Sequence, residues 1–173
     1  MTSSRREPRT LEPCPELELA DAFQIYVRRI EWINAKKLRH WNVLGYFEIY
    51  PYSYFEERRR QGEFFVYRDD VGAIVGAVVL RETDASWQEG DVSSAYYVHN
   101  LATEPSVRGV GATIMRLVHE KAVADGKRFL RLDCDEGSVF LNEYYDKLGY
   151  KIVGKCAYGE YRGVRRQLAL VGG

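Results

Sequence analysis

Residues 101–111 read LATEPSVRGVG, and the segments on either side of this stretch decide the fold class. Before it, residues 95–102 are rich in aromatic and apolar side chains, a composition typical of a strand. After it, apolar residues recur at the spacing of one helix face, at Ile114, Met115, Val118 and Ala122. The stretch is therefore predicted to be a glycine-containing turn that leads from a strand into a helix.

A turn of this kind is suited to bind phosphate. The first turn of a helix has unpaired N–H groups and a partial positive charge, and glycine lets a phosphate approach the backbone closely. The Walker phosphate loop is excluded because no Gly-Lys-Ser/Thr follows. The dinucleotide fingerprint GxGxxG is incomplete, because Ile114 or Met115 stands where its third glycine would be. From this motif alone, a pyrophosphate ligand and a tight turn without a ligand both stay open.

The segments around the turn predict one order of helices and strands. An amphipathic helix is expected over 16–37, followed by an aromatic, irregular connection over 41–54. Three further helices are expected, over 53–61, from the turn to Gly126, and over 139–147. Strands are expected over 63–68, 73–80, 95–102, 127–133, 150–157 and 161–170. With a first strand before the first helix, the order is βααβββαβαββ.

Length and charge narrow the class of protein. The chain has 173 residues, the size of one domain, with residues 1–8 expected to be a flexible terminus and 9–173 to be the single domain. Lys+Arg and Asp+Glu are both 25, so the net charge of zero argues against a nucleic-acid surface. No apolar run approaches the ~18 residues of a membrane span, and the first residues lack the apolar stretch of a secretory signal. We expect no membrane partner and a cytoplasmic location.

The three cysteines, Cys14, Cys134 and Cys156, have no CxxC spacing and no neighbouring histidine cluster. An odd number of cysteines without such spacing indicates neither a disulfide framework nor a zinc site. We therefore expect reduced thiols and no metal.

A second motif follows the strand predicted at 127–133. Residues 140–150 read FLNEYYDKLGY. The strand, the GxG turn, the helix, the next strand and YYDKLGY together resemble the GNAT superfamily of acyl-coenzyme A N-acyltransferases, over roughly residues 63–157. The resemblance implies an α/β (α+β) GNAT fold, with a central mixed, mostly antiparallel twisted sheet of six or seven strands flanked by about four helices.

The resemblance also implies acetyl-coenzyme A as acyl donor. Backbone groups of the turn would cradle its pyrophosphate, at Val107, Arg108, Gly109, Val110, Gly111 and Ala112. Two registers stay open, because the Arg/Gln position of the family motif falls either on Ser106 or on Arg108. In both registers the backbone from Arg108 to Gly111 stays on the phosphates.

Further cofactor contacts follow from the same resemblance. The strand residues Leu101, Ala102 and Thr103 would hold the pantetheine arm, where the strand bulges or splays from its neighbour. Ser138 stands where many family members have an Asn that touches the cofactor, and Asn142 is an unaligned substitute.

Two residues are candidates for proton transfer. Tyr145 matches the tyrosine that in many family members protonates the departing thiolate, and a phenol with a pKa of about 10 is a neutral donor at pH 7. Its alternative role is a packing aromatic. His99 is a candidate base, although a strand histidine is often a packed, hydrogen-bonded residue. Cys134 is the weaker candidate for a nucleophile, since no base stands beside it in the sequence.

The expected function is transfer of an acetyl group to a primary amine of a small molecule, by direct attack. The alternatives are an amino group of a protein or of an aminoacyl-RNA, and a non-catalytic acyl-coenzyme A binding module; a homodimer also stays open. The acceptor would lie near Trp32, Trp41, Tyr46, Tyr50 and Tyr54, which are otherwise core residues. The acidic run Glu82, Asp84, Glu89 and Asp91 either attracts a cationic amine or is a solvated loop.

Overall fold

The computed structural model describes residues 9–38, 41, 45–87 and 93–171. The expected flexible terminus at 1–8 lies outside these residues. The elements follow in the order β1 (Glu12–Pro13), η1 (Glu16–Glu18, a 3-10 helix), α1 (Leu19–Ala35), α2 (Tyr46–Ile49), α3 (Tyr52–Arg60), β2 (Phe64–Arg68), β3 (Ile74–Arg81), β4 (Ala95–Thr103), α4 (Val110–Ala124), β5 (Phe129–Asp135), α5 (Val139–Lys147), β6 (Lys151–Tyr158) and β7 (Tyr161–Ala169).

In the described part of the chain, seven strands form one sheet in the order β1-β2-β3-β4-β5-β7-β6. Every neighbouring pair is antiparallel except β4 and β5, which are parallel. A parallel pair needs a crossover connection, and α4 provides it. The mixed, mostly antiparallel sheet of six or seven strands expected from the sequence is confirmed.

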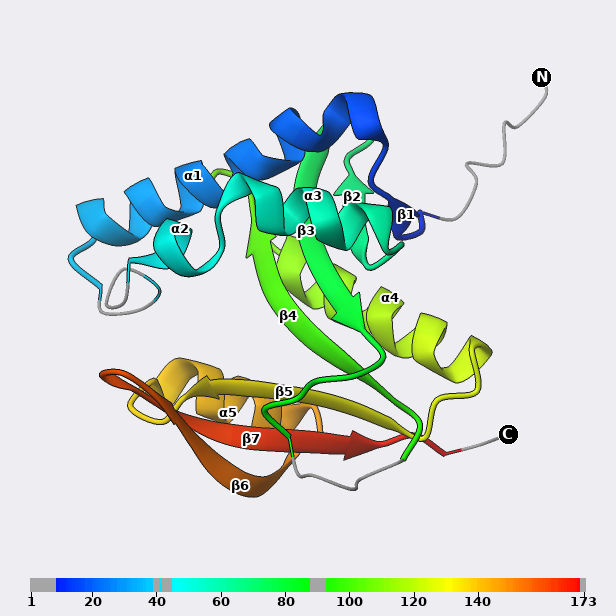
Figure 1. The fold of residues 1–173 in the computed structure, drawn as a ribbon, viewed down its shortest axis with the longest axis vertical. Helices are drawn as coiled ribbons and strands as arrows, with labels where there is room; N and C mark the ends of the chain where they lie inside the picture. Colours follow the sequence, from blue (N-terminus) through cyan, green and yellow to red (C-terminus); the bar gives the residue numbers. More distant parts are fainter. Residues whose placement is uncertain (1–8, 39–40, 42–44, 88–92, 172–173) are drawn as a thin grey trace.

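Helices cover both faces of this sheet (Figure 1). On one face, here called the α1 face, α1 and α3 pack on the β1–β4 half through an aromatic core that includes Tyr26, Phe55 and Phe64. On the opposite α4 face, α4 and α5 share a continuous core with the sheet, which includes Ile114 and Tyr145. The sheet therefore separates the side chains of its two faces. A bound molecule can contact both faces only where neighbouring strands separate.

The element order agrees with the sequence prediction, with two local differences. The predicted first helix begins as the 3-10 turn η1 and ends at Ala35, before Lys37, whose φ of 54° is left-handed. The connection predicted as irregular contains the one-turn helix α2. Periodicity cannot detect a helix of one turn, because a single turn shows no repeat.

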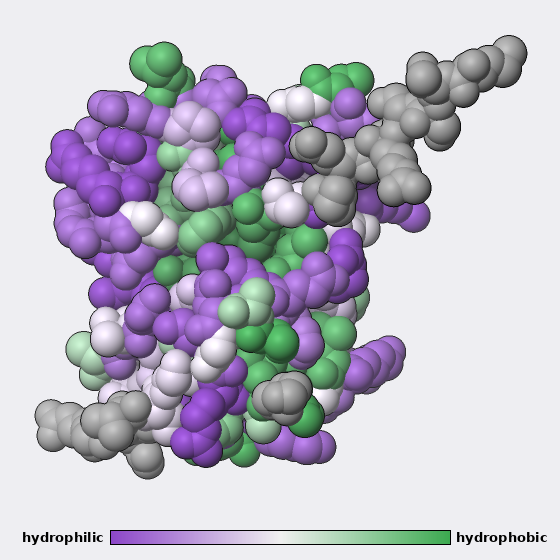
Figure 2. All heavy atoms as spheres, turned by 90° about the vertical axis from the view of Figure 1, so that its right-hand side faces the viewer, coloured by the Kyte–Doolittle hydropathy of each residue, from purple (hydrophilic) through white to green (hydrophobic). Residues whose placement is uncertain are grey.

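Figure 2 views the molecule from the end of the sheet at which β4 and β5 are paired, where a band of apolar side chains lies between polar regions.

Across the described parts of the chain, none of the helices combines the length and apolar character that a bilayer span requires. Within those same residues, His, Cys, Asp and Glu side chains form no group of three that could ligate a metal ion.

Candidate active site

The two parallel strands at the centre of the sheet separate soon after they meet. β4 and β5 pair only at Ala95–Phe129, Tyr96–Leu130 and Tyr97–Arg131. Beyond these pairs, β4 continues beside β3 while β5 continues beside β7, so the strands diverge (Figure 1). The splay expected near residues 100–103 is therefore present, and we call it the β4–β5 divergence.

β4 also carries a bulge at the divergence. Val79 on β3 pairs with His99, and Ala77 pairs with Ala102. Between these two pairs β3 advances by two residues and β4 by three, so β4 contains one extra residue. The irregular residue is Asn100, whose φ is 50°. A non-glycine residue at positive φ is uncommon and costs about 1–2 kcal/mol, so surrounding contacts must hold it in place.

Three tyrosines supply those contacts. The Tyr26 hydroxyl donates to the Asn100 carbonyl (2.5 Å), the Tyr54 hydroxyl donates to Asn100 Oδ1 (3.0 Å), and Asn100 Nδ2 donates to the Tyr46 hydroxyl (2.8 Å). These tyrosines come from three different helices, α1, α2 and α3. At about 1 kcal/mol for each hydrogen bond, the contacts offset the cost of the backbone conformation. Sequence reasoning missed this network, which we call the Asn100 clamp.

The turn before α4 has the geometry of an anion site. Gly109 precedes the helix with a φ of 78°, a conformation that glycine adopts without strain. Thr113 N–H bonds the Gly109 carbonyl (3.2 Å), but the N–H groups from Arg108 to Ala112 have no acceptor within the described residues. The helix of 15 residues thus presents consecutive unpaired amides and the positive end of its dipole.

Gly111 has a different role from Gly109. Its φ is not in the positive region, and a Cβ placed on it would meet only Thr103 Cγ2, at 3.9 Å. Internal packing therefore does not require glycine here, and its lack of a side chain leaves the backbone open from outside. Val107, Arg108, Gly109 and Val110 also line a hollow of about 210 Å³, together with Arg9 and Tyr67.

The predicted pantetheine strand is tied to α1. Arg29 donates from Nε to the Thr103 carbonyl (3.0 Å) and from Nη2 to Thr103 Oγ1 (2.6 Å). Ala102 is buried against the α1 face, and Leu101 packs at the edge of the α4-face core. The Thr103 side chain is thus engaged inside the protein, so contacts of this segment with a cofactor would come from its backbone.

Tyr145 lies on α5 and belongs to the α4-face core together with Val98 and Cys134. Its ring meets Tyr144 and Tyr150 edge-on, with centroids 5.3 and 5.5 Å away. Burial, reinforced by the nearby Cys134, raises the pKa of the Tyr145 hydroxyl well above its ordinary value. The phenol therefore keeps its proton at neutral pH, as a proton donor must.

Ser138 and Asn142 shape the start of α5. Ser138 is the N-cap, and its hydroxyl accepts from Leu141 N–H (3.3 Å). The Asn142 amide donates to the carbonyls of Asp135 (3.0 Å) and Ser138 (2.8 Å), and its Oδ1 accepts from the buried Arg166 (2.8 Å). Both side chains thus have structural partners, and their predicted contact with a cofactor stays a prediction.

His99 lies on the other side of the sheet from Tyr145. His99 and Tyr97 share a strand face, and the Tyr97 ring packs with Trp87 away from the α4-face core. His99 Nε2 is 2.9 Å from Asp84 Oδ2, in the loop after β3. Of the acidic run considered in the sequence, Glu82 is exposed while Asp84 is nearly buried, and Glu89 and Asp91 lie outside the described residues.

The aromatic residues proposed for the acceptor side divide into two groups. Tyr46 is buried and Trp41 stacks on it with centroids 4.8 Å apart, whereas Trp32 lies at the surface under Arg29. Tyr50 and Tyr54 are half-buried neighbours of the divergence. Burial raises the pKa of Tyr50, and the nearby Asp133, Tyr158 and Asp84 raise it further. Tyr50 therefore lies within electrostatic reach of both β5 and the Asp84 loop.

Asp133, on β5, faces the same side. Its Oδ2 accepts a hydrogen bond from the Tyr161 hydroxyl (2.8 Å), at the turn between β6 and β7. Gly163 makes room for this arrangement, because a Cβ there would lie 2.8 Å from the Tyr161 ring. Asp133 thus adds a carboxylate to the acceptor side.

The three cysteines are free and buried. Burial raises the pKa of each thiol, to about 11 for Cys14 and Cys156, and raises that of Cys134 despite the nearby Arg166. A protonated, buried thiol is a poor nucleophile. This setting does not favour an acyl-cysteine route.

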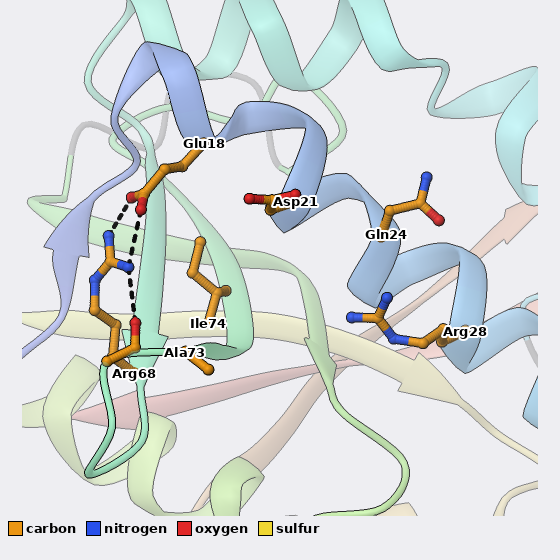
Figure 3. A pocket seen from close by; sticks show the side chains of 8 residues that line it. Glu18, Asp21, Gln24, Arg28, Arg68, Ala73 and Ile74 are labelled. Carbon is orange, nitrogen blue, oxygen red and sulfur yellow. Dashed lines mark hydrogen bonds and ion pairs between the residues drawn. The ribbon is translucent and has the colours of Figure 1, made fainter.

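A second hollow of about 310 Å³ lies between α1 and the β2–β3 turn (Figure 3). Arg68 at its edge pairs with Glu18 and donates to the Gly72 carbonyl (3.1 Å), and Arg28 pairs with Glu104 (2.7 Å). Because these charges are already paired, we assign no ligand to this hollow.

A diverging parallel strand pair beside a helix that presents free amides is the arrangement expected from the resemblance to acyl-coenzyme A dependent acyltransferases. The model of the acetyltransferase (GNAT) family matches residues 26–150. The chain therefore belongs to the GNAT family of N-acetyltransferases, enzymes that depend on acetyl-coenzyme A.

Individual relatives agree with this family. The chain is 26% identical to the uncharacterized N-acetyltransferase YesJ of Bacillus subtilis, over 78% of this chain and 77% of YesJ. A GNAT acetyltransferase from Listeria monocytogenes has a similar structure, with a TM-score of 0.77 at 19% identity, covering 92% of this chain and 95% of that one. The yncA protein of Salmonella typhimurium, solved with its cofactor acetyl-CoA, gives 0.65 at 14% identity and covers 96% of both chains.

Proposed function

We propose that this enzyme transfers the acetyl group of acetyl-coenzyme A to the primary amine of a small molecule, by direct attack in a ternary complex. The observation that carries the proposal is the β4–β5 divergence, which joins two otherwise separate faces of the sheet. Tyr145 lies on the α4 face of the divergence and His99 on the α1 face. A thioester held between the strands would have a proton donor on one side and a proton acceptor on the other.

The residues of the turn fit the donor. The unpaired amides from Arg108 to Ala112 suit a pyrophosphate, and the open backbone at Gly111 allows close approach. Donor binding through uncharged amides also agrees with a chain of zero net charge. The donor supplies a reactive thioester carbon, and the protein supplies binding, orientation and proton transfer.

In the proposed reaction, the amine nitrogen forms a bond to the acyl carbon, and the carbon–sulfur bond of the thioester breaks. His99 accepts the proton that the nitrogen loses, and Tyr145 gives a proton to the departing thiolate sulfur. Burial favours this role of Tyr145, because it raises the pKa of the hydroxyl and keeps it protonated.

The acceptor side offers aromatic rings and a carboxylate to an amine. Tyr50, Tyr54 and Asp133 are half-buried, so part of each side chain remains accessible to a ligand. The free thiols agree with the cytoplasmic location that we propose for the protein.

Thiol release from acetyl-coenzyme A, measured across a panel of primary amines, tests the proposal. We expect turnover with at least one small amine and its near loss in Tyr145→Phe. Turnover only with peptide or aminoacyl-RNA amines would move the acceptor to a macromolecule. Tight donor binding without turnover on any amine would indicate a binding module, and no rise in melting temperature at large donor excess would overturn the assigned donor.

A further inference from the structure

The loop after β3 brings a carboxylate against the candidate base. Asp84 Oδ2 lies 2.9 Å from His99 Nε2. The other oxygen, Oδ1, accepts hydrogen bonds from Ser86 N–H (2.9 Å) and from the Ser86 hydroxyl (2.7 Å). One oxygen of Asp84 is thus fixed by its own loop, and the other faces the imidazole.

The two partners differ in exposure. The Asp84 side chain is 9% exposed and the His99 side chain 21%. Burial alone would raise the pKa of Asp84, but His99 and the two Ser86 hydrogen bonds outweigh burial and hold the pKa well below its usual range. The carboxylate therefore stays charged and shielded, while part of the imidazole remains accessible.

The contact between His99 and Asp84 is mainly electrostatic, because the two groups are close but are not aligned as in a good hydrogen bond. His99 Nε2 is buried, and its N–H direction meets no aligned acceptor among the described residues, although Oδ2 is close. A negative charge at this distance favours a proton on Nε2 over a proton on the far nitrogen. In neutral His99, Nδ1 is then the nitrogen with the free lone pair.

Other charged groups surround this pair. Arg81, two residues after the His99 partner Val79 on β3, lies 3.7 Å from Glu63. Tyr50 feels the charges of Asp84, Asp133 and Arg81 together. Arg81 has its own acidic neighbour, and Asp133 accepts a hydrogen bond from the Tyr161 hydroxyl. Among the described residues, Asp84 is the carboxylate in direct contact with His99.

We propose that Asp84 is a positioning residue that makes His99 the base of the reaction. It holds the proton on Nε2, directs the Nδ1 lone pair to the acceptor, and stabilises the imidazolium that forms. The proton passes from the amine nitrogen to Nδ1 and then to water, so no other reactant is needed. This inference rests on the proposed acetyl transfer, of which it specifies the acceptor half.

The kinetic test compares Asp84→Asn with Glu82→Gln, an exposed acid on the same loop. At pH 7, Asp84→Asn is expected to lower kcat/KM for the amine about 10- to 100-fold. The acidic limb of its pH profile is expected to move to lower pH, because the imidazolium loses a neighbouring negative charge. Glu82→Gln should change kcat/KM for the amine by less than about 2-fold. Asp84→Asn should change the KM for acetyl-coenzyme A by less than about 2-fold. Asp84→Glu should return the acidic limb of the pH profile toward that of the unaltered enzyme.

A double variant separates positioning from folding. In a His99→Gln background, Asp84→Asn should lower kcat/KM by less than about 2-fold, because Asp84 acts through the imidazole of His99. An equal loss in both backgrounds, or an Asp84→Asn enzyme with unchanged rate and limb, would overturn the proposal. If Asp84→Asn does not fold, Ser86→Ala removes the hydroxyl hydrogen bond to Oδ1 and keeps the backbone N–H hydrogen bond and the carboxylate charge. This variant should lower kcat/KM in the same direction, and only while His99 is present.

A spectroscopic readout is independent of activity. In ¹⁵N–¹H spectra of the imidazoles, neutral His99 should carry its proton on Nε2, and the share of this tautomer should fall in Asp84→Asn, while the spectrum of the exposed His119 stays the same. A proton on Nδ1 of His99, or the same tautomer share in both proteins, would contradict the proposal even if no amine substrate is found. Failure to turn over any amine, with the expected spectra, would instead contradict the proposed function.

Discussion

On the α4 side of the β4–β5 divergence, the proposed donor site consists of backbone amides from one turn, residues 108–112, and one phenol, Tyr145. On the α1 side, the proposed acceptor site consists of side chains from the Asp84 loop, β4, β5 and the α2–α3 segment. Backbone amides at a helix start recur wherever such a turn forms, so phosphate binding at the proposed donor site does not depend on side-chain identity. The acceptor site depends on distant side chains and is free to differ among proteins with the same fold.

The largest expected effect comes from Tyr145, the proposed proton donor to the leaving group. Tyr145→Phe should lower kcat about 100-fold or more, because general acid catalysis typically contributes 10²–10⁴-fold. The Kd for acetyl-coenzyme A, measured by calorimetry, should change by less than about 3-fold. Tyr144→Phe on the same helix is the control and should keep kcat within about 2-fold; an equal loss in both variants would assign Tyr145 to packing.

The donor side can be disrupted separately with two matched glycine substitutions. Gly111→Ala should weaken acetyl-coenzyme A binding about 10-fold without loss of stability, since its Cβ meets only Thr103 Cγ2 and alanine favours the helix. Gly126→Ala, at the end of α4 with a φ of 70°, should lower the free energy of unfolding by about 1–2 kcal/mol and leave binding unchanged. Calorimetry and urea unfolding measure the two quantities, and the reverse pattern would contradict a phosphate site at Gly111.

The acceptor side can be loosened through the Asn100 clamp. Tyr46→Phe removes the hydroxyl that accepts from Asn100 Nδ2, so we expect a loss of about 1–2 kcal/mol in unfolding free energy and about 3- to 10-fold in kcat/KM for the amine. Tyr96→Phe is the control for stability, because Tyr96 is a buried tyrosine whose hydroxyl donates to Asp125. If both variants lose the same activity, the clamp has no separate role in positioning β4.

The smallest effect concerns pH. In the proposed role Tyr145 acts in its protonated form, and its raised pKa moves the loss of that proton to higher pH. With both substrates saturating, kcat should therefore stay level from about pH 8 to pH 10, the ordinary pKa of a tyrosine. A decline in this range that disappears in Tyr145→Phe would show that the hydroxyl titrates earlier than its burial implies.

The sequence predicted features that depend on neighbours along the chain. The element order follows from local periodicity, and the free amides follow from a glycine-containing turn at a helix start. Asp84 could not be distinguished from Glu82, because only the folded loop buries one acid against His99 and exposes the other. The Asn100 clamp was missed for the same reason, since Tyr26 is 74 residues away from Asn100 in the sequence.

The contacts of the buried Arg166 could not be predicted from the sequence either. Its guanidinium bonds Asn142 (2.8 Å) and Asp146 (2.7 Å), on either side of Tyr145 along α5. Sequence reasoning treated the last two strands only as β segments. No local pattern on β7 indicates that one of its arginines points into the core beneath α5.

In the proposed ternary complex, donor and amine are bound together, one on each side of the divergence. Initial rates measured while acetyl-coenzyme A and an accepted amine are varied together test this claim most directly. Double-reciprocal plots are predicted to intersect, as a ternary complex requires. Parallel lines, with an acetyl group on the enzyme after incubation with acetyl-coenzyme A alone, would contradict direct attack.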